Sequence, residues 1–497
     1  MADTKQPELE KFTKQEETSD NHGASNTAFR RQAFIALGTF MLTLGAGATS
    51  GFSAVLIPQL QHAKFQGHKF NTELISWVAA MSSLPLFCGN IISGYLMERF
   101  GRRRSQIILA VPFVAGWVTI GFATNIYLIL FGRFLTGLCQ GLLGPLGPVF
   151  IGEISTPIYR GLFLAALSLA IATGVLLSHV YGTFLHWSPA SLLCGIFPLI
   201  GGIIIFYAPE SPSWLASKGR IDECIKSFQW YRGTAPETKM ELDKMLSDQA
   251  QKQKVKNNLK TLRTNLKKPE FWKPMTIMVV FFIVTQLSGV NVICAYTPIM
   301  MKELLGGHNS RHDYTAMLGI DVLRCVSLGT ACVLLRRLGR RPMAIFSGVL
   351  TSISLIALAM YLYLIETDVI NHISPFISLG LMGIYMIVSN LGIVPLPWNM
   401  VGELFATATK GFGSGISVMM TSIAFFGTVK TAPHLFESIG FHGTYFFYGI
   451  STLLGTVFLI FFLPETRGKT LLQVEEYFRY GKKGKTKESE LKPLANV

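Results

Sequence analysis

The sequence predicts an all-α polytopic membrane protein, with twelve transmembrane helices arranged in two pseudo-symmetric halves of six. Three observations support this fold class. The 497 residues are 50% hydrophobic and only 15% charged. Long apolar runs, twelve in all, follow one another along the chain. The motifs that separate the first six runs recur, in the same order, among the second six.

This composition is typical of a protein that lies in a lipid bilayer rather than in water. Charged residues make up 15% of this chain, against about a quarter in soluble proteins. A spanning helix needs about 20 mostly apolar residues, so twelve would take roughly 240. A water-soluble enzyme, a secreted domain and a disordered protein are therefore poor interpretations. The seven cysteines show no zinc or haem spacing, and we expect no metal and no cofactor.

The apolar runs give the expected position of each span. In chain order they cover residues 33–57, 75–97, 106–124, 126–150, 161–184, 190–208, 274–300, 314–335, 343–365, 373–400, 412–430 and 443–463. The first run lacks a cleavage site and is too long for a signal peptide. Prolines inside the runs, such as Pro145 and Pro395, are acceptable in a bundle because neighbouring helices satisfy the freed backbone groups.

The distribution of charge between the runs predicts the topology. The gaps after the second and eighth spans hold two clusters of arginine: Arg99, Arg102, Arg103 and Arg104, and Arg336, Arg337, Arg340 and Arg341. Positive residues stay on the cytoplasmic side of a membrane. We therefore expect both termini and all even-numbered gaps to face the cytosol.

Together these features divide the chain into five parts. They are a cytosolic N-terminal tail (1–32), a six-helix half (33–208), a polar cytosolic linker (209–273), a second six-helix half (274–463) and a cytosolic C-terminal tail (464–497). The net charge of +15 needs no nucleic acid to explain it, because no aromatic interleaving or known module accompanies it. The cluster of Lys482, Lys483, Lys485 and Lys487 is either part of a solvated tail or a contact for anionic lipid.

An internal repeat relates the two halves. Arg-Phe-Gly-Arg-Arg at 99–103 recurs as Arg-Leu-Gly-Arg-Arg at 337–341. The run from Gly152 to Gly161 matches that from Gly402 to Gly411, and Pro-Glu-Ser at 209–211 matches Pro-Glu-Thr at 464–466. Such a duplication implies a pseudo-two-fold axis along the membrane normal and a cavity between the halves. The pattern favours a transporter over a channel or an intramembrane enzyme.

The same motifs carry a family resemblance over the whole chain. They are Glu-Arg-Phe-Gly-Arg-Arg (98–103), Gly-Arg-Phe-Leu-Thr-Gly (132–137), Gly-Glu-Ile-Ser (152–155), Pro-Glu-Ser-Pro-Ser-Trp-Leu (209–215), Gln-Leu-Ser-Gly-Val-Asn (286–291), Pro-Leu-Pro-Trp (395–398) and Pro-Glu-Thr-Arg-Gly-Lys-Thr-Leu (464–471). In this order they resemble the sugar porter family of the major facilitator superfamily. Residues 51–60 and 428–431 are similar to its insect branch of trehalose and glucose facilitators.

Charged residues at the cytoplasmic helix ends are expected to form a gate. The candidates are Arg99, Arg103, Arg133, Glu153, Arg160 and Glu210 in the first half, and Arg337, Arg341, Glu403, Lys410 and Glu465 in the second. At a low-dielectric interface such ion pairs attract more strongly than exposed ones. The resemblance implies that they latch the cytoplasmic ends and separate when the cavity opens inward. We expect Arg102, Arg104 and Arg340 to act only as topology determinants, and Arg336 departs from the acidic residue that the family commonly has there.

Amides and an aromatic plane are the groups expected to bind a sugar, since Asn and Gln offer both a donor and an acceptor. Gln286 and Asn291 flank Ser288-Gly289, so both reach one ligand only if the helix loosens there. By resemblance, the sugar-contacting positions are Gln286, Asn291, Trp398, Asn390, Thr285 and Ser168. Thr285 and Ser168 stand where the family usually has Gln, and Ile423 and Val394 also depart from its pattern. A satisfied buried amide or a core aromatic is the alternative interpretation.

Two further charges lie inside a span. Asp321 and Arg324 are three residues apart, close enough to pair on one helix face. They are either a mutually neutralising structural pair or a coupling site in which Asp321 binds substrate or carries a proton. His179 is expected to be a capping or interface histidine.

Three functional hypotheses remain. The leading one is a facilitator that equilibrates a hexose or disaccharide across the plasma membrane, because the first span has no carboxylate between Ala33 and Gln61. The others are a proton-coupled sugar or polyol symporter and a non-transporting sugar sensor. An endomembrane location is the alternative to the plasma membrane.

Overall fold

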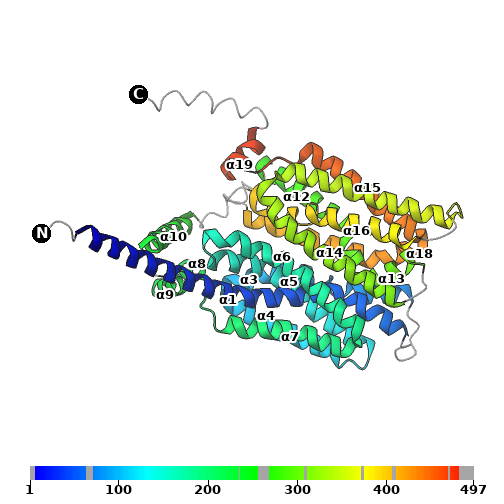
Figure 1. Cartoon of the computed structure of the whole chain (residues 1–497), viewed down its shortest axis with the longest axis horizontal. Coiled ribbons are helices and arrows are strands. Elements are labelled where there is room, and N and C mark those ends of the chain that lie inside the picture. Colours follow the sequence, from blue (N-terminus) through cyan, green and yellow to red (C-terminus); the bar gives the residue numbers. More distant parts are fainter. Residues whose placement is uncertain are drawn as a thin grey trace.

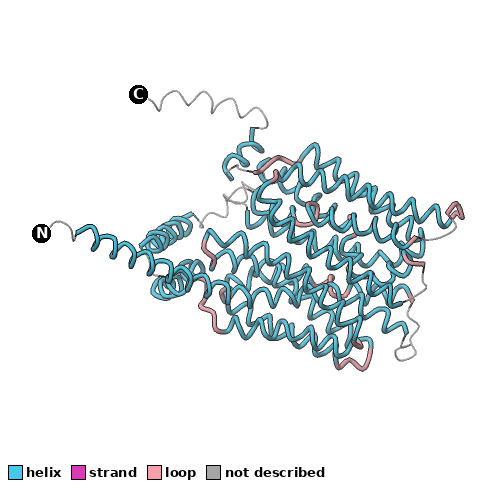
Figure 2. Tube along the Cα trace, in the orientation of Figure 1, coloured by secondary structure: helices cyan, strands magenta, loops and turns pink. Residues whose placement is uncertain are grey.

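The protein is a helical bundle in the computed structural model of the chain, which describes residues 6–62, 71–233, 236–255, 268–306, 310–370, 374–405, 410–467, 469 and 471–480. Short loops join the helices, and the described part of the chain contains no strand (Figure 2). The Lys482 to Lys487 cluster lies outside these residues.

Seven helices make up the first half, and Figure 1 shows most of them side by side. They are α1 (Gln6–His62), α2 (Thr72–Ala80), α3 (Leu86–Phe100), α4 (Arg102–Gly121), α5 (Ile126–Ile154), α6 (Pro157–Phe184) and α7 (Trp187–Phe206). Asn125 caps α5 by accepting the Leu128 N–H at 2.9 Å, and Pro157 stands in the first turn of α6. Both are residues that favour a helix start. The helix α1 begins well before the expected boundary at residue 33.

The polar segment between the halves forms α8 (Pro212–Ser217), α9 (Ile221–Arg232) and α10 (Pro236–Val255). Trp214, Cys224 and Phe228 belong to a small core of their own in this segment. Figure 1 shows these three helices outside the bundle, at the same end as α19.

The second half follows the same plan. Its helices are α12 (Pro269–Leu287), α13 (Val290–Leu304), α14 (Ser310–Arg337), α15 (Arg340–Glu366), α16 (Pro375–Leu391), α17 (Leu396–Leu404) and α18 (Lys410–Phe462), followed by α19 (Leu471–Tyr480).

These helices account for the expected spans. Among the described residues, ten segments are long and apolar enough to cross a membrane. The pair α2 and α3 supplies another passage, since each alone is too short, and the positive φ of 69° at Gly440 divides α18 into two. The all-helical fold class is confirmed, and the described helices correspond to the twelve expected spans.

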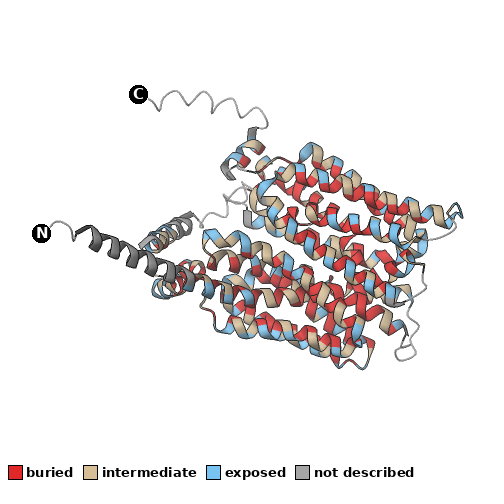
Figure 3. Ribbon diagram, in the orientation of Figure 1, coloured by how far each residue is buried: buried red, intermediate tan, exposed pale blue. Residues whose placement is uncertain are grey.

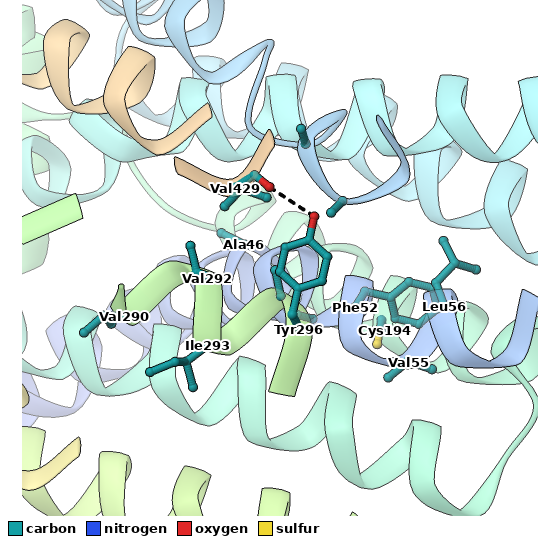
Figure 4. Packing of buried hydrophobic residues seen from close by; sticks show 14 of the residues in the cluster. Ala46, Phe52, Val55, Leu56, Cys194, Val290, Val292, Ile293, Tyr296 and Val429 are labelled. Carbon is teal, nitrogen blue, oxygen red and sulfur yellow. Dashed lines mark hydrogen bonds between the residues drawn. The ribbon is translucent and has the colours of Figure 1, made fainter. Parts of the chain in front are cut away.

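The hydrophobic core differs between the two ends of the bundle. We call the end where α3 meets α4 at Gly101 and α14 meets α15 at Gly339 the Arg-rich end, and the opposite end the far end. One core joins both halves: it includes Phe52 of α1 together with Tyr296 of α13, which Figure 4 shows close together. A separate core of the second half, including Met343 and Met400, lies toward the Arg-rich end. Buried residues fill the interior of the bundle (Figure 3).

The helices α1 and α6 approach each other through paired glycines. A Cβ at Gly174 would overlap the Leu44 carbonyl oxygen, and one at Gly47 would overlap the Ile171 carbonyl oxygen. Small residues allow such close backbone contact between membrane helices.

We expect Gly174→Ala to destabilise the fold by about 1–3 kcal/mol, because the added methyl group forces the two backbones apart. Gly94→Ala on α3 is the matched control, since a Cβ there has open space around it. The measurement is the unfolding equilibrium of each variant in mixed micelles. Equal stabilities of the two variants would contradict the close-packing argument.

Candidate functional site

A carboxylate caps the first helix that starts at the Arg-rich end. Glu210 accepts the backbone N–H groups of Arg102 at 2.7 Å and Arg103 at 2.9 Å, at the start of α4. A helix N-terminus leaves these donors unsatisfied and favours negative charge. Gly101 has a φ of 95°, and a Cβ there would meet the Glu210 carboxylate. The glycine of the Arg-Phe-Gly-Arg-Arg motif is therefore required by backbone conformation and by space.

The capped helix is also tied to the end of α5. Arg102 pairs with Glu153 at 2.7 Å, and both side chains are about four-fifths buried. The other carboxylate oxygen of Glu153 accepts the Ser211 hydroxyl at 2.5 Å. This chain of bonds links the start of α4, the end of α5 and the segment after α7.

The second half repeats this arrangement at every position. Glu465 accepts the N–H groups of Arg340 at 3.0 Å and Arg341 at 3.1 Å. Arg340 pairs with Glu403 at 2.9 Å, and Glu403 accepts the Thr466 hydroxyl at 2.5 Å. Burial alone would raise the pKa of Glu465, but the backbone N–H groups that it accepts hold this pKa below its usual value. The repeat seen in the sequence is thus also a repeat of contacts.

The choice of arginines differs from the expectation. Arg102 and Arg340 carry the ion pairs, so the expectation that they act only as topology determinants is wrong. The Arg103 and Arg341 side chains donate instead to the carbonyls of Phe206 at 2.5 Å and Ile460 at 2.7 Å.

The other expected gate residues lie around these networks. Arg99 donates to the Tyr95 hydroxyl at 2.5 Å, Arg160 donates to the Ser155 carbonyl at 3.4 Å, and Arg337 is exposed. The side chains of Lys410 and Arg336 lie outside the described residues. Each ion pair joins helices within a single half: Arg102–Glu153 lies in the first half and Arg340–Glu403 in the second.

Arg133 is not at the Arg-rich end, and its expected position was wrong. The helix α5 starts at the far end, which places Arg133 in its first third. The side chain is fully buried and donates to the carbonyls of Thr49 at 2.9 Å and Ala79 at 3.2 Å, and to the Ser82 hydroxyl at 2.9 Å. A charge inside an expected span was the sequence signal for this buried role.

A helix break brings the expected sugar-binding amides together. Gly289 takes a φ of 82° between α12 and α13, a conformation that glycine adopts readily. The Asn291 side chain then donates to the Gln286 side-chain oxygen at 2.6 Å. The loosening that the spacing of these two residues requires is present in the structure.

A second break, between α16 and α17, packs against the first. The Thr285 hydroxyl donates to the Ile393 carbonyl at 2.9 Å, and the Trp398 ring lies 5.1 Å from that of Phe282. Trp398 is 50% exposed. Through Thr285 and Phe282, α12 therefore contacts the second break and the helix α17 that follows it.

The two remaining sugar-binding candidates differ from this group. Asn390 is fully buried, and its amide donates to the Met386 carbonyl at 2.8 Å, while its side-chain oxygen has no partner. Ser168 lies on α6 of the first half and is partly exposed.

Asp321 has a different partner from the one expected. Its carboxylate lies 2.5 Å from Nδ1 of His179 on α6, and Arg324 contacts the Cys294 sulfur instead. Of the two alternatives for Asp321, the structural ion pair with Arg324 is therefore not formed, and His179 is an interface histidine, as expected. This contact joins the two halves.

A polar cluster at the far end also joins the halves, and the sequence analysis did not identify it. Glu73, before the second span, pairs with Lys430 of α18 at 2.7 Å, and His434 lies 3.2 Å from the same carboxylate. The Lys430 ammonium lies 4.3 Å from the centre of the Trp77 ring. A lone lysine in an apolar run was the available signal.

We expect Arg102→Gln to lower the free energy of unfolding by about 1–2 kcal/mol, between the values for an exposed ion pair and a buried charged hydrogen bond. Arg104→Gln is the control, because Arg104 is exposed and only its backbone N–H reaches Glu210. The measurement is reversible unfolding in mixed micelles. Equal effects of the two substitutions would show that total charge, rather than this ion pair, stabilises the Arg-rich end.

Known proteins are similar to this chain in sequence and in fold. The family model for sugar (and other) transporters matches residues 32–478. The facilitated trehalose transporter Tret1 of Polypedilum vanderplanki is 29% identical over 474 residues, which are 93% of this chain and 91% of that protein. Tret1 of Bombyx mori is 30% identical, over 81% of this chain and 79% of the relative.

Solved structures support the same fold. The proton:xylose symporter XylE bound to 6-bromo-6-deoxy-D-glucose aligns with a TM-score of 0.73 at 21% identity, over 90% of this chain and 100% of that one. An inward open conformation of XylE from E. coli aligns equally well, at 20% identity and over 90% and 99% of the two chains. Given a family match over most of its length, this protein belongs to the sugar porter family of the major facilitator superfamily.

Proposed function

We propose that the protein is a facilitative transporter that moves a hexose or a disaccharide of the glucose and trehalose class by alternating access. The observation that carries this proposal is the Gln286–Asn291 pair at the helix break, together with the half-exposed ring of Trp398 on α17, which packs against α12 through Phe282. The two amides offer donors and acceptors to sugar hydroxyls, and the ring offers an apolar face to the pyranose. The similarity to facilitated trehalose transporters supports the substrate class.

Alternating access requires two halves that move as units, and the bonding pattern supports this. The ion pairs of the Arg-rich end lie within each half, so neither is broken when the halves rotate. One hydrophobic core joins the halves, and a second core belongs to the second half alone. A bundle held together at the far end and divided at the Arg-rich end matches an inward-facing state, if that end is cytosolic as the arginines indicate.

Facilitated diffusion needs no coupling ion, and the surroundings of Arg133 favour it. This cation is held by carbonyls and hydroxyls, including the Thr49 carbonyl and the Ser53 hydroxyl of α1. The first span has no carboxylate between Ala33 and Gln61, so it has no acid that could exchange a proton with Arg133. A proton-coupled symporter is the second candidate, and the buried Asp321 favours it.

A sugar sensor that does not transport is the third candidate. The Thr285 hydroxyl is already bonded to the Ile393 carbonyl, so the site has lost one of the ligand groups that the family usually supplies. We also propose that both termini lie in the cytosol, because the Arg-rich end carries the positive charge, and that the membrane is the plasma membrane.

The first test is a time course of labelled glucose and trehalose uptake into proteoliposomes with an inward proton gradient. We expect uptake to level off at the external concentration whether or not the gradient is present. Accumulation above that level would contradict facilitation and establish a symporter. Absence of both uptake and counterflow would leave the sensor.

Gln286→Ala tests the binding site directly. We expect the KM of the transported sugar to rise about two- to thirteenfold, the range that corresponds to one neutral hydrogen bond of about 0.5–1.5 kcal/mol. Thr276→Ala on the same helix is the control, because its hydroxyl is bonded to the Trp272 carbonyl on an exposed part of α12. An unchanged KM in Gln286→Ala would remove Gln286 from the site.

A further inference from the structure

The contact between His179 and Asp321 is the most buried polar bridge that the structure gives between the two halves. The His179 side chain is fully buried and that of Asp321 is 5% exposed. The residues lie on α6 and α14, which pack against each other across the interface. Ionisable groups at such a depth are costly unless they are paired.

The second ring nitrogen of His179 limits the protonation states of this pair. Nε2 lies 3.1 Å from the Gly51 carbonyl oxygen, and a carbonyl oxygen only accepts. Nε2 therefore carries a hydrogen and donates it. At the other side of the ring, Nδ1 and the carboxylate lie 2.5 Å apart, which requires one hydrogen between them.

This requirement fixes the number of protons in the contact. Either an imidazolium donates to an ionised Asp321, or a protonated Asp321 donates to a neutral ring. If the shared proton is lost, the lone pair of Nδ1 faces a carboxylate and the contact becomes repulsive. The close packing of Gly51 on His179, where a Cβ would lie 3.1 Å from Nε2, limits the movement of the ring toward α1.

The neighbouring groups supply an alternative partner for the deprotonated acid. Near Asp321 lie Arg324 and Cys325 of α14 and Cys294 of α13, and Tyr385 of α16 faces Arg324. The helix α1 contributes the Gly51 carbonyl. Arg324 is three residues from Asp321, within reach of it on one helix face. Loss of the shared proton therefore allows the carboxylate to leave α6 for Arg324 within the second half.

We propose that His179 and Asp321 form a proton-binding site between the two halves, in which one bound proton is needed for the contact and its loss releases α14 from α6. For transport this proposal rests on the proposed function, and it makes the rate of sugar exchange depend on pH. As a binding site it stands independently of transport.

The test compares the unfolding equilibrium of the full-length wild type with that of Asp321→Asn from about pH 5 to about pH 8, the range in which histidine titrates. The asparagine amide donates to Nδ1 of a neutral ring, so it keeps the hydrogen bond without an additional proton. The folded contact needs one shared proton between Nδ1 and the carboxylate, whereas the separated side chains of the unfolded chain do not, so wild-type stability falls as the proton concentration falls. Relative to Asp321→Asn, the wild-type equilibrium is expected to shift toward unfolding by about tenfold per pH unit, the factor for one proton.

Two further variants keep the test decisive. Ser327→Ala on α14, whose hydroxyl bonds the Leu323 carbonyl, is the control and should show the wild-type pH dependence. If Asp321→Asn does not fold, His179→Gln replaces it, because its amide donates to the ionised carboxylate without a shared proton. A pH profile of Asp321→Asn, or of His179→Gln in its place, that runs parallel to the wild-type profile would overturn the proposal.

Sugar counterflow at equal pH on both sides is the second measurement. We expect the wild-type rate to change with pH and the Asp321→Asn rate to be constant. Absence of counterflow in every form, together with the tenfold difference in unfolding, would reject the proposed function and retain the proton site. Counterflow with identical pH profiles in both forms would reject the proton site and retain the transporter.

Discussion

The capping of a helix start by a carboxylate from another segment organises both halves. A helix that begins at the membrane surface exposes N–H groups that must be satisfied. Glu210 and Glu465 accept these groups at the starts of α4 and α15. Because each carboxylate follows the last span of its half, the cap closes that half on itself. The Arg102–Glu153 and Arg340–Glu403 pairs extend the closure to the fourth and tenth spans. In the described part of the chain, no ion pair joins the two units at this end.

In the second half, two helices are interrupted, at the α12–α13 break and the α16–α17 break. Backbone groups freed inside a membrane must find partners within the protein. The Thr285 hydroxyl takes up the Ile393 carbonyl at the α16–α17 break, and the Tyr385 hydroxyl takes up the Ser288 carbonyl at the α12–α13 break at 2.7 Å. The breaks are thereby stabilised, and the amides of Gln286 and Asn291 are left to bind each other or a ligand. A polar site is thus formed by the same bonds that allow the helices to end.

Two of the polar contacts between the halves are made by ionisable side chains. The Glu73–Lys430 pair and the His179–Asp321 contact both join one half to the other, whereas the ion pairs of the Arg-rich end do not. If the halves rotate as we propose for transport, the former contacts break and the latter are preserved. Where polar contacts hold a moving interface, protonation or competition for a partner changes the equilibrium between states.

The sequence by itself determined the helices, the duplication and the break at Gly289, because hydrophobic runs, repeated motifs and residue spacing are local properties. It also placed Gln286 and Asn291 near each other. It did not decide which arginine of each cluster meets a glutamate. Arg99 and Arg102 lie on opposite sides of the turn at Gly101 in the sequence, and only the conformation of that turn directs Arg102 to Glu153. It placed Arg133 at the wrong end of α5 and paired Asp321 with Arg324, because spacing along one helix indicates which groups can meet but not which competitors a neighbouring helix supplies. Only the packing of α6 against α14 brought His179 to Asp321, and only the approach of α18 to α2 brought Lys430 to Glu73.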